Sequence, residues 1–249
     1  MLYVAAPRCH PNSAIARFGF SKIFPVPGRI GAVKIAGRVF FPPLLPKFPA
    51  RHPFSGNMNS PLRRLLTILA AWGLAAVAAG ALRLMLHVPP FMVPLLIGGL
   101  TAALAAAAFG SGWMAGAVRS IGTRAILRVH LLRFIGFYFL LLHAHGRLPR
   151  EFAERAGWGD VIAAAGAFIL LLVPPGAGFS RSLAVWNWIG LIDLVVAVGT
   201  AGWLNIARPG SMSELAGLPL ALVPLWIVPI LLASHLVLFR RIGAEKPGD

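Results

Sequence analysis

A few polar side chains lie inside long apolar runs of this sequence, and their types could support chemistry. Arg133 and Asp193 lie at similar depths in two of these runs, counted from the same end. An ionisable group in hydrocarbon costs roughly 2.5–3.5 kcal/mol on insertion scales, so it needs a partner there. Because a guanidinium matches a carboxylate with two hydrogen bonds, we predict an Arg133–Asp193 ion pair. In the alternative, Arg133 extends back to the lipid headgroups.

Three further polar residues, Asn187, His130 and His235, lie at the same level as this pair. The spacing of four, three, four and three residues predicts one helix face made of Trp186, Gly190, Asp193, Ala197 and Thr200. The predicted binding cluster consists of Arg133, Asn187, Asp193, His235 and His130. It would serve as a proton or cation site, and the alternative for Asp193 is a structural carboxylate. Two histidines at one level also suit a haem or a metal, although hydrogen-bonded histidines at a helix interface are the simpler interpretation.

A second polar group is expected at the outer end of the bundle. It contains Asp160, Trp158 and His143, and Asp160 ends a Gly-Trp-Gly-Asp sequence that we interpret as a turn. An aspartate at a helix start caps free backbone N–H groups, which is the expected role of Asp160. Residues 144–159 are then an outer loop with a short amphipathic helix, and Trp158 lies at headgroup depth. His143 and His145 are two residues apart and do not share a helix face, so we predict no metal site there.

Six long apolar runs must position these residues. They predict an all-α, polytopic membrane bundle. About 20 residues cross a hydrocarbon core of roughly 30 Å. Five of the runs reach that length, while the fourth is short. Their expected bounds are residues 65–86, 92–114, 126–143, 160–173, 183–206 and 218–239.

The composition agrees with a bilayer rather than water as the solvent. Hydrophobic residues make up 58% of the chain and charged residues 12%, whereas a soluble domain is nearer 25% charged. The net charge of +16 resembles that of a nucleic-acid-binding protein, but the arginines gather at the ends of the runs and the chain has no basic recognition helix. One cysteine, Cys9, excludes an internal disulfide and a site with several cysteine ligands. No sequence motif predicts a cofactor.

Residues 1–57 differ from the rest of the chain. They contain nine prolines, eight lysines or arginines and no acidic residue. Met58 opens a sequence that is typical of a natural start, with a short polar leader and two arginines before an apolar run. We therefore expect a proline- and arginine-rich leader without stable structure, or a misplaced start, followed by a membrane domain over residues 58–249. A targeting segment is a weaker alternative, because proline is so frequent.

The arginines in the loops predict the orientation of the bundle. Nine basic residues lie on the side of the two chain ends, against five on the other side. Since cytoplasmic loops carry an excess of lysine and arginine, we expect both termini in the cytoplasm.

From residue 129 to residue 241 the sequence resembles a family of small uncharacterised bacterial integral membrane proteins. The pattern includes a G-W-G-D sequence and a W-N-x-x-G-x-x-D-L helix. It falls on Arg133, Gly136, Gly146, Gly157, Trp158, Gly159, Asp160, Trp186, Asn187, Gly190, Asp193, Pro229 and His235. The resemblance implies a multi-pass protein of a bacterial cytoplasmic membrane and carries no activity with it. The first two apolar runs lie outside it.

The leading functional hypothesis is a non-enzymatic membrane protein, either transporter-like or an accessory subunit. Its expected partners are the lipid bilayer and, for an accessory subunit, other membrane proteins. The alternative is a membrane-embedded enzyme or a haem-binding redox protein that uses His130 and His235.

Overall fold

The computed structural model describes residues 34–35, 38–39, 60–110, 112–174 and 176–244. The chain divides into two units, Met1–Phe54 and Ser55–Asp249. In the first unit the structure describes a two-residue antiparallel ladder between β1 (Lys34–Ile35) and β2 (Arg38–Val39). The predicted leader or misplaced start otherwise lies outside the described residues.

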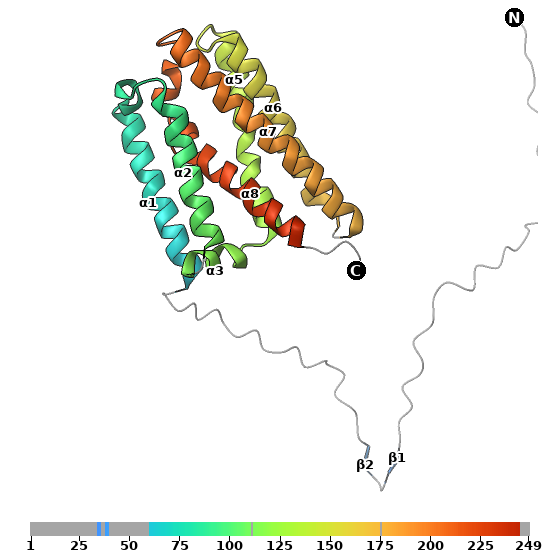
Figure 1. Cartoon of the computed structure of the whole chain (residues 1–249). Helices are drawn as coiled ribbons and strands as arrows, with labels where there is room; N and C mark the ends of the chain where they lie inside the picture. Colours follow the sequence, from blue (N-terminus) through green and yellow to red (C-terminus); the bar gives the residue numbers. More distant parts are fainter. Residues whose placement is uncertain (1–33, 36–37, 40–59, 111, 175, 245–249) are drawn as a thin grey trace, which may run out of the picture. The chain divides into compact units, whose positions relative to one another are not determined.

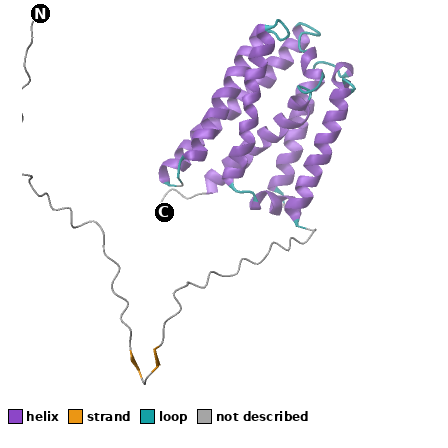
Figure 2. Ribbon diagram, turned by 180° about the vertical axis from the view of Figure 1, so that it is seen from behind, coloured by secondary structure: helices purple, strands orange, loops and turns teal. Residues whose placement is uncertain are grey.

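The second unit is a helical bundle, as the sequence predicts (Figure 1, Figure 2). Within the described residues, six helical segments are long and apolar enough to cross a membrane. The helical elements are α1 (Pro61–Ala81), η1 (Leu84–His87), α2 (Met92–Phe109), α3 (Trp113–Ser120), α4 (Thr123–Val129), η2 (His130–Ile135), α5 (Gly136–Ala144), α6 (Arg150–Leu172), α7 (Ala177–Ala207), η3 (Ser213–Ala216), the π-helical turn η4 (Val223–Ile227) and α8 (Val228–Ala244).

The fourth span is where the prediction was wrong. The sequence Gly-Trp-Gly-Asp does not form a turn, because α6 begins at Arg150 and continues without a break through it. Each glycine in a helix interior costs only about 1 kcal/mol relative to alanine. Packing offsets that cost, because α6 buries a face of aromatic and small residues between α5 and α7. The predicted loop at residues 144–159 is therefore mostly helix, and the fourth span has full length.

The third span contains an irregularity that the sequence did not predict. Between α4 and α5 the backbone tightens into the 3₁₀ segment η2, and both His130 and Arg133 are on it. The 3₁₀ geometry turns the side chains differently from an α-helix, and such mid-helix segments often mark functional sites. In the last span the prolines Pro224 and Pro229 accompany the π-helical turn η4 and the start of α8.

The two ends of the bundle carry different charges. We call the end where α1 begins and α8 ends the terminal face, and the end with the α1–α2, α5–α6 and α7–η3 connections the loop face (Figure 1). Among the described residues, the terminal face has eight arginines and no acidic side chain: Arg63, Arg64, Arg119, Arg124, Arg128, Arg181, Arg240 and Arg241. The loop face has five arginines and three glutamates: Arg83, Arg147, Arg150, Arg155, Arg208, Glu151, Glu154 and Glu214.

Candidate functional site

Arg133 lies between two aspartates in the middle of the bundle. Its Nε donates to Asp160 Oδ1 at 2.7 Å, and its Nη2 donates to Asp193 Oδ2. Its Nη1 donates to the carbonyl oxygen of Gly190 at 3.1 Å. Arg133 is only 1% exposed and Asp160 is 6% exposed, so both are withdrawn from lipid. We call Arg133, Asp160 and Asp193 the ion triad.

The triad joins three separate spans at mid-depth. Arg133 comes from η2, Asp160 from α6 and Asp193 from α7. Asp160 is ten residues from the start of α6, which corresponds to roughly 15 Å along the helix and therefore to about half of a 30 Å hydrocarbon core.

Glycines make room for these side chains. A Cβ atom on Gly159 would overlap the Asp193 carboxylate, so the absence of a side chain there lets α7 bring that carboxylate against α6. On α7, a Cβ on Gly190 would lie 2.7 Å from Cε1 of His235 and 3.2 Å from Nη1 of Arg133. These distances are shorter than normal carbon contacts, so both positions require glycine for the arrangement to form.

A neutral polar layer adjoins the triad. Nδ1 of His235 lies 2.7 Å from Oδ1 of Asn187, and Nδ2 of Asn187 donates to the His235 carbonyl oxygen at 3.1 Å. Nε2 of His130 lies 2.9 Å from Oγ of Ser234. The two imidazole rings have centroids 4.4 Å apart, and the Trp186 ring contacts both. His130, Asn187 and His235 are completely buried.

The hydrogen bonds assign the tautomers of both histidines. Ser234 uses its hydroxyl hydrogen to donate to the Leu231 carbonyl oxygen, so Nε2 of His130 must be the donor to Ser234. Asn187 presents its carbonyl oxygen to His235, so Nδ1 of His235 must donate. The other ring nitrogens, Nδ1 of His130 and Nε2 of His235, are buried without a hydrogen-bond partner in the described part of the chain. Both therefore carry lone pairs.

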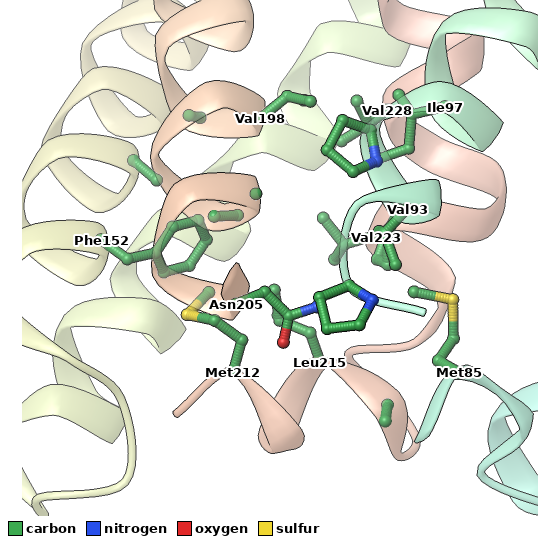
Figure 3. A pocket seen from close by; sticks show the side chains of 18 of the residues that line it. Met85, Val93, Ile97, Phe152, Val198, Asn205, Met212, Leu215, Val223 and Val228 are labelled. Atoms are coloured by element: carbon green, nitrogen blue, oxygen red, sulfur yellow. The ribbon is translucent and has the colours of Figure 1, made fainter. Parts of the chain in front are cut away.

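A cavity of about 280 Å³ is lined by residues near the loop face and, deeper in the bundle, by Asp160. Figure 3 shows Met85, Met212 and Asn205 around it, together with the valines of α2, α7, η4 and α8. Almost all of the lining side chains are apolar. The polar exceptions are Asn205 and Ser213 near the loop face and Asp160 at the inner end. The cavity therefore suits an apolar molecule with one polar group.

The structure brings all five residues of the predicted cluster together. The Arg133–Asp193 ion pair is confirmed, and Asn187, His130 and His235 lie in the adjoining layer. Whether this cluster binds a ligand stays a prediction.

The outer group was predicted wrongly. Asp160 does not cap a helix start, because it is in the interior of α6 and pairs with Arg133. Trp158 is 54% exposed on the outer surface of the same helix, in the eighth position after its start rather than in a loop. His143 lies apart from Asp160 and bonds through Nδ1 to the Leu148 carbonyl oxygen at 3.2 Å.

Sequence reasoning missed two contributors, the second carboxylate of the triad and Ser234. A signal for Asp160 was present in the sequence. The residues that follow one another at spacings of one and three are all buried: Phe152, Ala153, Ala156, Gly157, Asp160, Ala163, Ala164 and Ala167. That spacing predicts a continuous helix face with Asp160 in its middle. Ser234 adjoins His235 in the sequence, and no pattern distinguished it.

Within the described residues, no group of three or more His, Cys, Asp or Glu side chains is arranged to hold a metal ion. The searches of curated proteins and of solved structures gave no match to this chain. A family model matches residues 90–243, which is more than half of the chain, and its description is a domain of unknown function. The match includes α2, so the resemblance drawn from the sequence was too narrow at its beginning. This multi-pass membrane protein belongs to the DUF8737 family, whose domain has no known function.

Proposed function

We propose that this protein is a transporter-like, non-enzymatic membrane protein that binds a small, mostly apolar cation in the cavity at Asp160. The observation that carries the proposal is an apolar cavity with one buried carboxylate at its inner end. Apolar walls favour hydrocarbon groups, and a few placed polar groups set the orientation of a ligand. A carboxylate offers only acceptors when it is ionised, so the matching group is an ammonium or another cationic donor.

The charge distribution supports a position and an orientation for this binding. Among the described residues the terminal face has eight arginines and no acidic side chain, whereas three glutamates accompany five arginines on the loop face. By the positive-inside rule, the terminal face lies in the cytoplasm and the cavity extends from the external side. We place the protein in a bacterial cytoplasmic membrane, with the lipid bilayer as its surrounding partner.

A binding comparison of three molecules of similar shape tests this proposal. The purified chain in detergent micelles is titrated with 2-phenylethylammonium, with neutral 2-phenylethanol and with anionic phenylacetate. We expect the cation to bind about tenfold or more tightly than the alcohol, because a hydrogen bond to a charged group contributes about 1.5–3 kcal/mol. Phenylacetate should bind most weakly. Equal binding of all three, or no binding of the cation, would overturn the proposal.

Variants locate the bound molecule. Asp160→Asn should remove the preference for the cation over the alcohol. Ala201→Phe fills the cavity from α7 and should weaken binding of both molecules. The matched control is Val196→Phe, which adds the same side chain to the outer surface of α7, where Val196 is 46% exposed. Uptake of the radiolabelled cation into proteoliposomes then separates carriage across the bilayer from binding alone.

The histidines favour a second candidate, a redox protein or enzyme that holds a group between them. The specific observation is the two buried ring nitrogens without partners, Nδ1 of His130 and Nε2 of His235. The two rings would have to move apart to hold a haem iron between them, because their centroids are only 4.4 Å apart. The absorption spectrum of the purified protein tests it, because a Soret band would support haem ligation.

A further inference from the structure

The ion triad contains two carboxyl groups and one guanidinium. If both carboxyl groups are ionised, these three side chains carry a net charge of −1. An uncompensated charge in the interior of a protein or membrane is expensive, and two carboxylates that share one site resist simultaneous ionisation. The triad therefore needs one more positive charge to be neutral.

The adjoining histidines do not supply that charge. Each ring already donates one hydrogen bond through the nitrogen that faces an acceptor. A second proton would be placed on Nδ1 of His130 or Nε2 of His235, where no acceptor lies. It would also be close to a like charge, because Nη1 of Arg133 and Nε2 of His235 both lie beside Gly190. Both imidazoles are therefore neutral.

The other elements around the triad bring no further cation to it within the described residues. From η2 come His130 and Arg133, from α6 comes Asp160, from α7 comes Asp193, and from α8 comes His235. No charged side chain occurs on α2, and the two arginines of α4 lie toward the terminal face, where Arg124 donates to the carbonyl oxygens of Leu171 and Val173 at the end of α6. Two titratable side chains of α5, Tyr138 and His143, lie toward the loop face, where Tyr138 is near Arg147 and His143 bonds to the Leu148 carbonyl.

One member of the triad borders the cavity, although the side chain of Asp193 is more exposed than that of Asp160 (18% against 9%). Asp160 lines the cavity, whereas Asp193 and Arg133 are not among its lining residues. A cation at the inner end of the cavity would therefore meet Asp160 first. It would supply the positive charge that the triad lacks.

We propose that one proton is shared between Asp160 and Asp193 when the cavity holds no cation, and that a bound cation displaces this proton. This inference rests on the proposed function and adds a one-for-one exchange to it. The proton leaves a carboxyl oxygen of the triad and passes through the cavity to water at the loop face. The triad and its counter-ion remain neutral in both states, so neither state buries a net charge.

The experiment measures proton release and cation binding in the same sample. The full chain in detergent micelles is titrated with 2-phenylethylammonium by calorimetry, in two buffers of different ionisation enthalpy. We expect about one proton to be released for each cation bound near neutral pH. Because the proton and the cation compete, the apparent Kd for the cation should rise about tenfold for each unit that the pH falls.

Infrared spectroscopy gives an independent measurement on the unmodified chain. The C=O stretching band of a protonated carboxyl group should be present without the cation and should disappear when 2-phenylethylammonium binds. In Asp193→Asn the triad has one carboxylate and one guanidinium, so it no longer needs a proton. Cation binding to this variant should be weaker, because the bound state then carries a net charge of +1, and it should release no proton.

The outcomes separate the two proposals. Binding of the cation without proton release and without a change in the carboxyl band overturns the exchange and leaves the proposed function standing. No binding of the cation overturns both. Release of one proton in the native chain, together with none in Asp193→Asn, supports the exchange.

Discussion

Arginine meets carboxylate in two very different regions of this protein. On the loop face, Nη2 of Arg147 lies 2.6 Å from Oε2 of Glu214, with 54% of the arginine side chain exposed. Arg150–Glu154 and Arg208–Glu151 are also exposed pairs. In the centre of the bundle, Arg133 pairs with Asp160 and Asp193 with only 1% of its side chain exposed. The groups are nearly identical in chemistry, and the surroundings differ.

The difference in surroundings sets a different consequence for each region. Exposed pairs gain little, because water solvates each charge nearly as well as the partner does. In the buried triad no solvent replaces a lost partner, so the loss of one member leaves a charge in a low dielectric. The exposed pairs also balance one arginine with one glutamate. The triad has two carboxyl groups for one arginine, which is the imbalance that a proton or a cation would correct.

The largest expected effect breaks the triad at its centre. Arg133→Gln leaves two carboxyl groups near mid-membrane without a cation, so we expect a loss of about 3–5 kcal/mol in the free energy of unfolding. Denaturant unfolding of the purified chain in micelles measures it.

A multiple-mutant cycle identifies the cause of this loss. In an Asp193→Asn background Arg133→Gln should still be costly, because Asp160 remains. It should cost much less once Asp160→Asn is added to that background. Equal, additive losses in all backgrounds would show that Arg133 stabilises the bundle through packing rather than through the two carboxyl groups.

A smaller effect tests how the triad is assembled. Gly159→Ala places a methyl group where the Asp193 carboxylate lies, so α6 and α7 must separate or the ion pair must break. We expect a loss of about 3 kcal/mol, at the upper end of the range for overpacking. The matched control is Gly199→Ala on α7, where an added Cβ meets nothing within 4 Å. That substitution should be neutral or slightly stabilising, since alanine favours helix over glycine. Equal effects at both positions would contradict the close packing.

The sequence was sufficient to predict the bundle and one of the two ion pairs in the triad. Long apolar runs indicate directly which segments are buried in lipid. The similar depths of Arg133 and Asp193 in two of these runs predicted their ion pair. The prediction of the outer group was wrong because the glycines were interpreted as the sign of a turn. Gly157 and Gly159 suggested a turn, but in a packed membrane helix they permit close approach of a neighbouring helix. Asp160 was consequently placed at a helix start instead of in the core.

Two features had no local signal in the sequence. The cavity is formed by parts of η1, α2, α5, α6, α7, η3, η4 and α8 that are distant in the sequence, so no single run could indicate it. The 3₁₀ segment η2, which includes His130 and Arg133, contains no proline or glycine that would indicate it. Its geometry depends on the contacts of these side chains with three other spans. Tertiary packing determined both features.

A third effect, smaller again, tests the neutral layer beside the triad. Asn187→Leu removes the acceptor for Nδ1 of His235 and the donor to the His235 carbonyl oxygen. We expect a loss of about 1–2 kcal/mol, because two buried polar groups lose their partners while the volume is nearly kept. Nitrogen-15 NMR of labelled histidine should show one protonated and one lone-pair nitrogen in each ring of the native chain. In Asn187→Leu only the His235 signals should change, and an unchanged His235 tautomer would contradict the assignment.

The smallest effect is expected at the exposed pairs. Glu214→Gln should leave the thermal midpoint unchanged within the scatter of the measurement, because Arg147 regains water when its partner is lost.

Glu214 raises the pKa of Arg147 through a side-chain hydrogen bond. The stabilisation that accompanies this raised pKa is fully present at pH values below the ordinary pKa of arginine. It is lost only when the pH rises through the higher pKa that Arg147 has in the folded chain. The difference between native chain and variant should therefore stay flat between about pH 6 and 9. Raising the salt concentration should reduce any residual difference, since exposed charges are screened. A loss comparable to that of Arg133→Gln would mean that exposure does not separate these regions, and the comparison would then fail.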